Sequence, residues 1–372
     1  MSGARLEIPF IDMRAVNADD REELIAVATR VIESGNFISA DEVRGFEAEL
    51  ASYCGTRHGV GVSSGTSSIH LMLQASGVGP GDEVIVPANT FWASAEGIAC
   101  TGATPALVDV LETTVNIDPA AVEAAITPRT AAILAVHLYG QPAAMTELRT
   151  IAERHGILLF EDAAQAIGAR WDGAPVGALG HAASFSFYPG KNLGALGEAG
   201  GVTTDDAALA ERIRVLRSHG EVRKYVHAEM GFNERMDELQ AAFLRVKLRR
   251  LPAEQARRDE RVEQYRQLLL GNPKVALFET DNRATSVTHL LVVQVDDRDR
   301  VLDDLRANGV GAAIHYPTPL HLQAGGHHLG RAGQFPVAES LASRILTLPL
   351  YSAITEAQVA SCVSTLEQIV GQ

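Results

Sequence analysis

The chain has 372 residues, and its 32 Lys and Arg residues are outnumbered by 46 Asp and Glu, which gives a formal net charge of −14. This acidic balance disfavours nonspecific binding to nucleic acids or anionic membranes. Apolar residues make up 46% and charged residues 21%, as in ordinary soluble globular proteins. The length exceeds what one simple core usually accommodates, so we expect two domains.

Short apolar segments alternate with helical patterns over the first half of the chain. We expect strands at residues 60–64, 83–87, 104–110, 131–140 and 157–164, and helices at 67–77, 118–126 and 145–156. This alternation is typical of an α/β fold whose mostly parallel sheet is covered on both faces. In such folds ligands bind at the carboxyl ends of the strands.

The pattern changes from about residue 236. We expect a long charged helix at 237–270, broken or bent at Pro252, then a strand at 289–295, a helix at 298–309, a strand at 311–317 and a last helix at 355–370. The sequence therefore predicts a large domain of residues 1–250 and a smaller C-terminal α/β domain of residues 251–372.

Cysteine usage and the N-terminal sequence bear on location. The three cysteines, Cys54, Cys100 and Cys362, are far apart and odd in number, as expected of free thiols in a reducing compartment. The first twenty residues lack an apolar run of signal-peptide length, and no segment is long enough to span a membrane. We expect a cytoplasmic protein.

Lys191 lies in the stretch SFSFYPGKNLGALGEAGG, residues 184–201. A phosphate-binding P-loop does not fit, because Phe185 replaces its first glycine and Asn192 its Ser or Thr. The apolar strand before Lys191 would instead bury the amine and lower its pKa, as a lysine that forms a Schiff base with an aldehyde cofactor requires. Taken alone, an exposed surface lysine is the more common situation.

Three further segments follow strands in the same manner. Asp162 ends the strand in ILLFEDAAQ and would pair with the pyridinium nitrogen of pyridoxal phosphate, with Gln165 near its ring oxygen; the alternative is a helix cap. In SSGTSS, Gly65 and Thr66 open a helix and would bind a phosphate, unless they are a plain N-cap. Phe91 is an aromatic that would stack on a ring or belong to the core.

Each segment alone is weak evidence, but together they fit one cofactor, pyridoxal 5′-phosphate. The chain also resembles the fold-type I, aspartate aminotransferase-like nucleotide-sugar aminotransferases of the DegT/StrS type over nearly its whole length. The strings that carry the resemblance include SSGTSSIHLML, EDAAQAIGA, SFSFYPGKNLGALGE, GFNERMDELQAAFLRVKL and IHYPTPLHLQ.

The resemblance implies roles for matching residues. Lys191 would bind the cofactor covalently and act as general acid and base. The cofactor would also be held by phosphate ligands, a stacking ring and polar partners of the pyridine ring, namely Gly65, Thr66, Ser186, Phe91 (with Trp92 beside it), Asp162 and Gln165. Asn233 would reach the phosphate of the other subunit, which implies a homodimer with shared active sites.

The resemblance also implies a substrate class. The lysine segment is similar to that of members acting on TDP-3-keto-6-deoxyhexoses, with L-glutamate as amino donor and an amino sugar nucleotide as product. The substrate would then contact Tyr188, Lys224, His315 and Tyr316. A 4-keto sugar is a serious alternative, and the other interpretation of these residues is a surface loop and half-buried strand residues.

Other functions have less support from the residues. A related branch replaces the lysine with histidine and performs dehydration, whereas this chain keeps Lys191. A non-catalytic, regulatory relative has no reason to retain both Lys191 and Asp162.

Ala199 stands where many members have glycine, which we expect to alter the loop without affecting Lys191. His321, His327 and His328 have no cysteine partner nearby, so we expect a flexible loop and no metal.

Overall fold

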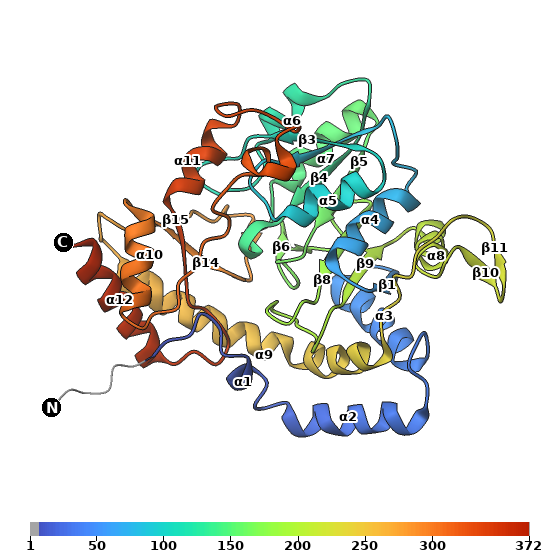
Figure 1. Ribbon diagram of the computed structural model, residues 1–372, viewed down its shortest axis with the longest axis horizontal. Coiled ribbons are helices and arrows are strands. Elements are labelled where there is room, and N and C mark those ends of the chain that lie inside the picture. Colours follow the sequence, from blue (N-terminus) through green and yellow to red (C-terminus); the bar gives the residue numbers. More distant parts are fainter. Residues whose placement is uncertain (1–6, 372) are drawn as a thin grey trace.

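The computed structural model describes residues 7–371, and a seven-stranded sheet organises the larger part of them (Figure 1). The strand order is β1 (His58–Val62), β9 (Gly200–Thr204), β8 (Ala182–Ser186), β5 (Leu158–Asp162), β4 (Thr130–Val136), β2 (Glu83–Pro87) and β3 (Thr104–Val108). Neighbours from β8 to β3 pair in parallel, while β9 is antiparallel to both β1 and β8. The predicted mostly parallel sheet is confirmed.

Helices cover both faces of this sheet. One face packs on α4 (Gly65–Ala75), α5 (Trp92–Cys100) and α8 (Ala207–Leu216), and the other on α3 (Asp41–Cys54), α6 (Pro119–Ala125), α7 (Met145–His155) and the first half of α9 (Glu238–Leu269). Strand residues alternate between the two cores, since Ile133 and Leu159 join one and Leu134 and Phe160 the other. All four are buried, which explains why the strands read as continuous apolar runs.

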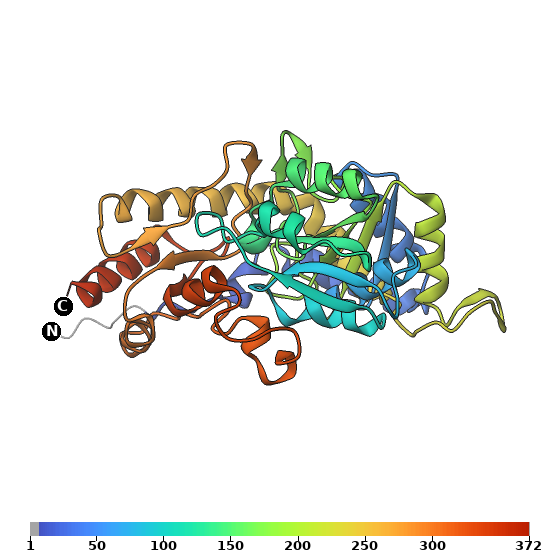
Figure 2. The ribbon, with the colours of Figure 1, turned by 90° about the horizontal axis from the view of Figure 1, so that it is seen from above.

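The C-terminal part has its own core around a small antiparallel sheet of β12 (Ala276–Leu277), β14 (Leu291–Gln294) and β15 (Ile345–Leu348). The helices α10 (Arg298–Ala307), α11 (Pro336–Arg344) and α12 (Glu356–Val370) belong to this half of the chain. Ile8 is buried in the same core and bridges to Val310, so the N-terminal segment packs on the C-terminal part. Figure 2 shows both parts joined along α9.

The remaining elements complete the described residues. They are α1 (Met13–Val16), α2 (Arg21–Ser34), β6 (Arg170–Trp171), β7 (Ala174–Pro175), β10 (Glu221–Arg223), β11 (Val226–His227), β13 (Ala284–Thr285) and the 3₁₀ turns Leu138–Gly140, Leu320–Leu322 and Ala324–Gly326. Within residues 7–371, no helix combines the length and apolar character needed to cross a membrane. The division at residue 250 falls inside α9 and stays a prediction.

The structure decides two expectations about individual elements. Of the break or bend expected in the long helix, the break is absent, since α9 runs without interruption through Pro252, which is exposed. The expected strand at 311–317 is reduced to one bridge between Ala313 and Thr347. The Tyr139 hydroxyl donates to the carbonyl of His315, which removes that carbonyl from any sheet ladder.

Candidate active site

A cavity of about 550 Å³ opens at the carboxyl ends of the parallel strands. Its lining includes most of the residues predicted from the sequence, namely Gly65, Thr66, Phe91, Asp162, Gln165, Ser186, Tyr188, Lys191, His315 and Tyr316. These residues follow β1, β2, β5 and β8 or come from the C-terminal part of the chain. The topology thus brings together segments that are far apart in the sequence, as expected for this class of sheet.

The N-terminus of α4 forms one end of the cavity. Ser64 is the N-cap, and its hydroxyl accepts a hydrogen bond from the amide of Ser67 at 3.1 Å. A Cβ added to Gly65 would lie 2.6 Å from the Cβ of Ser186, so only glycine allows α4 to approach β8 this closely. The free amides of this helix turn, with the hydroxyls of Thr66 and Ser186, form a cradle suited to a phosphate.

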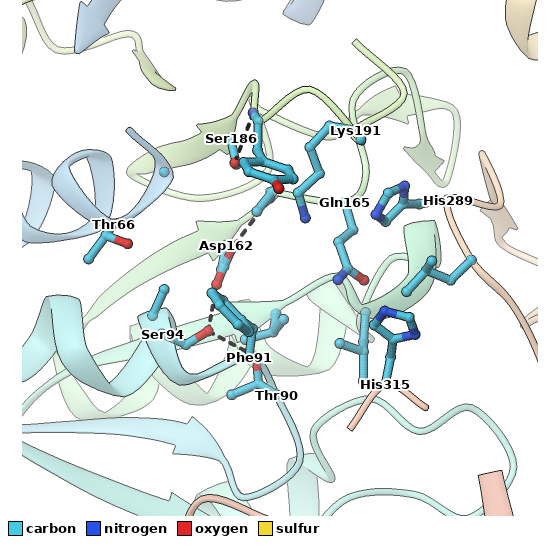
Figure 3. Close-up of a pocket in the computed structure, with 18 of the residues that line it drawn as sticks. Thr66, Thr90, Phe91, Ser94, Asp162, Gln165, Ser186, Lys191, His289 and His315 are labelled. Carbon is cyan, nitrogen blue, oxygen red and sulfur yellow. Dashed lines mark hydrogen bonds between the residues drawn. The ribbon is translucent and has the colours of Figure 1, made fainter. Parts of the chain in front are cut away.

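Asp162 ends β5 with its carboxylate inside the cavity wall, where the residue is 5% exposed. Its Oδ2 accepts a hydrogen bond from Ser94 Oγ at 2.7 Å, and Ser94 Oγ lies 2.9 Å from Thr90 Oγ1 (Figure 3). Oδ1 accepts a longer bond of 3.2 Å from the amide of Ala164. No helix follows Asp162 in this described stretch, so the capping alternative does not apply.

Lys191 lies in the turn after β8, where its amide donates to the carbonyl of Tyr188 at 2.8 Å. Figure 3 shows its side chain pointing into the space between Asp162, Gln165 and His289. Burial lowers the pKa of the amine to about 8, although the nearby Asp162 carboxylate acts in the opposite direction. The amine is therefore partly deprotonated near neutral pH, and the surface-loop alternative is excluded by its position in the cavity.

Aromatic residues line the opening of the cavity. Phe91 is 55% exposed, and its ring lies 5.5 Å from that of Tyr316 at an angle of 38°. Trp92 packs instead against the core on the α4–α5 face. The predicted partner Gln165 accepts a 2.6 Å bond from the amide of Tyr139 and donates at 3.2 Å to the Tyr316 hydroxyl.

His315 stands on the C-terminal side of the cavity. Its Nδ1 lies 2.9 Å from Thr347 Oγ1, and its ring stacks on Phe10 with 5.6 Å between centroids. Burial, assisted by the charge of Lys191, lowers the pKa of His315 to about 4. The imidazole is therefore neutral at physiological pH.

Two predicted site residues lie outside this cavity. Lys224 belongs to the exposed β10–β11 hairpin, which projects from the body of the protein, and its amine sits 5.3 Å from the centre of the Tyr225 ring. Asn233 is exposed and accepts a 2.7 Å bond from Arg235. Their expected roles toward a substrate or a second subunit stay predictions.

Sequence reasoning did not identify Ser94, Thr90 or His289. The first two have only a weak signal in the sequence, since Thr90 precedes α5 and Ser94 lies in its first turn. His289 has only the weak signal of a lone histidine before an apolar strand. It is buried beside Lys191, and burial together with the Lys191 charge holds the pKa of its imidazole well below the usual value.

Comparison with known proteins bears directly on this site. A model of the DegT/DnrJ/EryC1/StrS aminotransferase family matches residues 18–367. The chain belongs to this family. It is 48% identical to the erythromycin biosynthesis sensory transduction protein EryC1 of Saccharopolyspora erythraea, over 97% of this chain and 99% of that protein. It is 46% identical to dTDP-3-amino-3,4,6-trideoxy-alpha-D-glucose transaminase of Streptomyces venezuelae, over 92% and 91%.

Solved structures agree with the family assignment. The crystal structure of S. venezuelae DesV is 43% identical and superposes with a TM-score of 0.96, covering 98% of this chain and 99% of that one. NtdA of Bacillus subtilis, described with bound cofactor PMP, is 32% identical with a TM-score of 0.93, over 100% and 87% of the two chains. The protein is a pyridoxal phosphate-dependent aminotransferase of nucleotide sugars, with the predicted fold-type I architecture.

The residues of this chain fit that cofactor. The cavity contains a lysine whose pKa is lowered to about 8 and, across from it, a buried carboxylate. The N-terminus of α4 lines the cavity beside Ser186, and a Cβ at Gly65 would clash with Ser186 and disturb this arrangement. An aldehyde, a pyridine nitrogen and a phosphate each have a suitable partner here.

Proposed function

We propose that the protein transfers an amino group from L-glutamate to a TDP-3-keto-6-deoxyhexose and so makes an amino sugar nucleotide. The observation that carries this proposal is the placement of Lys191, with its pKa of about 8, in one cavity with the buried Asp162. The name of the S. venezuelae relative supports amination at the 3-position. The alternative substrate is a 4-keto sugar, which differs in the position of one carbonyl. The experiment must therefore distinguish 3-keto from 4-keto substrates.

Each residue of the cavity has a defined task in this proposal. Asp162 would pair with the pyridine nitrogen, and Gly65, Thr66 and Ser186 would hold the phosphate. When bound, the cofactor supplies an electron sink that stabilises negative charge on the carbon next to the transferred amino group. Lys191 Nζ would take the proton from that carbon of the donor and return one to the sugar carbon.

We assign the substrate side of the cavity to Tyr188, His315 and Tyr316, which all line it. Burial and the neighbouring Asp162 carboxylate raise the pKa of Tyr316, so its hydroxyl stays protonated and can donate a hydrogen bond. His315 is neutral and adds no charge. We propose that these groups contact the sugar, and that Lys224 of a second subunit pairs with the pyrophosphate.

The first experiment records the visible spectrum of the purified protein with pyridoxal phosphate before and after L-glutamate, for the wild type and Lys191→Ala. We expect glutamate to bleach the wild-type band. The variant should lose about 10²–10⁴-fold in turnover, the usual contribution of a positioned acid–base group.

TDP-3-keto and TDP-4-keto sugars are then offered separately to the aminated form. Faster conversion of the 4-keto sugar would overturn the 3-keto assignment, and no bleaching would overturn the choice of glutamate.

We also propose a homodimer with shared active sites. The support is the projecting β10–β11 hairpin, on which Tyr225 is 82% exposed, and the exposed Asn233 just after it. If Asn233 serves the partner's cavity, mixed dimers of Lys191→Ala and Asn233→Ala contain one intact site. Mixing two inactive variants should then restore about a quarter of wild-type activity for random pairing of subunits. No recovery on mixing would contradict shared sites.

The expected cytoplasmic location stays a prediction.

A further inference from the structure

The segment that carries Lys191 lies along one side of the long helix α9. Gln240 Oε1 accepts a 3.0 Å bond from the amide of Leu196, and Lys247 Nζ donates at 2.8 Å to the carbonyl of Gly194. Further along the helix, Gln255 Oε1 accepts a 3.1 Å bond from the side-chain amide of Asn192. Three α9 side chains therefore bind three different positions within the six residues that begin at Lys191.

The spacing of these side chains matches the helix period. Residues 240 and 247 are two turns apart and lie almost above one another, and residue 255 follows about two turns later on the same side. The unbroken course of α9 through Pro252 keeps all three in register. A break at Pro252, one of the two outcomes that the sequence suggested, would have separated Gln255 from the other two.

Lys247 is an unusual residue for such a position. Burial lowers the pKa of its amine, and Asp20 and Glu254 offset only part of that effect. Burying a cation costs free energy that an apolar side chain of similar length would not cost. A general role in stability therefore does not explain Lys247, whereas its bond to the Gly194 carbonyl does tie α9 to the lysine segment.

The other side of the same segment is held by the C-terminal part of the chain. Asn192 donates to the carbonyl of Val287 at 2.9 Å, and its Oδ1 lies 3.0 Å from Nδ1 of His289. Gly194 is folded closely against Pro189, since an added Cβ would meet the Pro189 carbonyl oxygen at 2.2 Å. The segment is thus fixed between α9 and residues 287–289, with Lys191 pointing into the cavity.

We propose that Lys247 and Gln240 are positioning residues, which hold residues 192–196 against α9 and thereby keep the Lys191 amine buried in the cavity. The proposal rests on the proposed role of Lys191 as the cofactor lysine. Neither side chain lines the cavity, so each acts through the backbone of the lysine segment.

The test measures the pKa of Lys191 directly in the full-length protein after removal of the cofactor. The protein is acetylated briefly with acetic anhydride at a series of pH values, and the label on Lys191 is quantified by mass spectrometry. For the wild type we expect a midpoint near pH 8. In Lys247→Met the freed segment should let water reach the amine, so the midpoint should move up by about one unit, toward the ordinary lysine value.

The controls separate an effect on the position of the Lys191 segment from an effect on the stability of the fold. Lys274→Met removes another lysine that donates to a backbone carbonyl, that of Val370 at 2.7 Å, but far from the lysine segment, and its midpoint should equal that of the wild type. Gln240→Met loses only a neutral bond and serves if Lys247→Met does not fold, as judged by circular dichroism. Unchanged Lys191 midpoints in the folded variants would overturn the proposal. Because the labelling needs no cofactor and no substrate, a failure of the glutamate reaction would leave this result standing.

Discussion

At the scale of single residues, Lys191 and Asp162 show how one environment affects two groups differently. Burial lowers the pKa of Lys191 because it disfavours the charged amine, and the carboxylate nearby reduces the effect. Asp162 is also buried, but the hydroxyl of Ser94 and the amide of Ala164 stabilise its charge. A buried amine and a hydrogen-bonded carboxylate thus share one cavity.

The Lys191 pKa predicts a pH dependence for uptake of the cofactor. Only the free amine reacts with an aldehyde, and the folded-state pKa is lowered from 10.5 to about 8. Covalent uptake of pyridoxal phosphate by cofactor-free protein should therefore accelerate up to about pH 8 and level off above it. Stopped-flow absorbance measures this rate. A rate that kept rising to pH 10 would show an ordinary, solvated lysine.

Ser94 allows a second prediction about Asp162. Ser94→Ala removes the 2.7 Å hydrogen bond to the carboxylate. A bond to a charged group contributes about 1.5–3 kcal/mol, so affinity for the cofactor and the rate with glutamate should each fall roughly tenfold or more. Ser343→Ala, which removes a hydroxyl bonded to the Ser340 carbonyl on α11, is the control. Equal cofactor affinity in both variants, measured by fluorescence titration, would refute the role of Ser94.

At the scale of elements, the start of α4 can pack on β8 only because Gly65 has no side chain. In Gly65→Ala the new Cβ would press on Ser186, and α4 and β8 would have to separate. Because both contribute to the phosphate cradle, we expect the affinity for pyridoxal phosphate to fall about tenfold while the sheet stays folded.

The control for this substitution is Gly79→Ala. Gly79 lies just after α4, and the nearest atom to an added Cβ is 3.8 Å away, so the change should be harmless. Equilibrium dialysis measures cofactor binding, and thermal unfolding reports the fold. If Gly65→Ala bound the cofactor as well as Gly79→Ala does, the cradle would have to lie elsewhere.

Elements of the large sheet could be predicted because local pattern and environment agree there. Strands β2, β4 and β5 are buried on both faces, so most of their residues are apolar, and the polar residues at or just after their carboxyl ends mark the sheet edge that carries the site. The 311–317 segment has a similar composition but was predicted wrongly, since a distant hydroxyl binds the His315 carbonyl. Contacts such as His289–Asn192 depend on tertiary structure alone and leave no local pattern.

At the scale of the whole molecule, the β10–β11 hairpin and the residues just after it carry apolar side chains that this chain does not cover. Tyr225 and Met230 are 82% and 89% exposed. If they pack on a second subunit, the double substitution Tyr225→Ser and Met230→Ser should weaken the dimer by at least about tenfold, because fully burying one such side chain contributes about 1.5–3 kcal/mol. Sedimentation velocity over a concentration series measures the shift.

Leu270→Ser is the matched control for the hairpin. Leu270 is 86% exposed at the end of α9, on the opposite side of the molecule from the hairpin (Figure 1). This variant should sediment as the wild type does. If the double variant also sedimented as the wild type does, the proposal that Tyr225 and Met230 pack on a second subunit would be wrong.

The packing of the N-terminal segment on the C-terminal part has a consequence for protein synthesis. Phe10 leaves the ribosome early, but its partner His315 and the bridge from Ile8 to Val310 form only when most of the chain has been translated. The strands of the large sheet can pair before that point, whereas the wall of the cavity cannot close. The nascent chain therefore acquires a complete cofactor pocket only near the end of translation, and loading of pyridoxal phosphate belongs to the last stage of the protein's maturation.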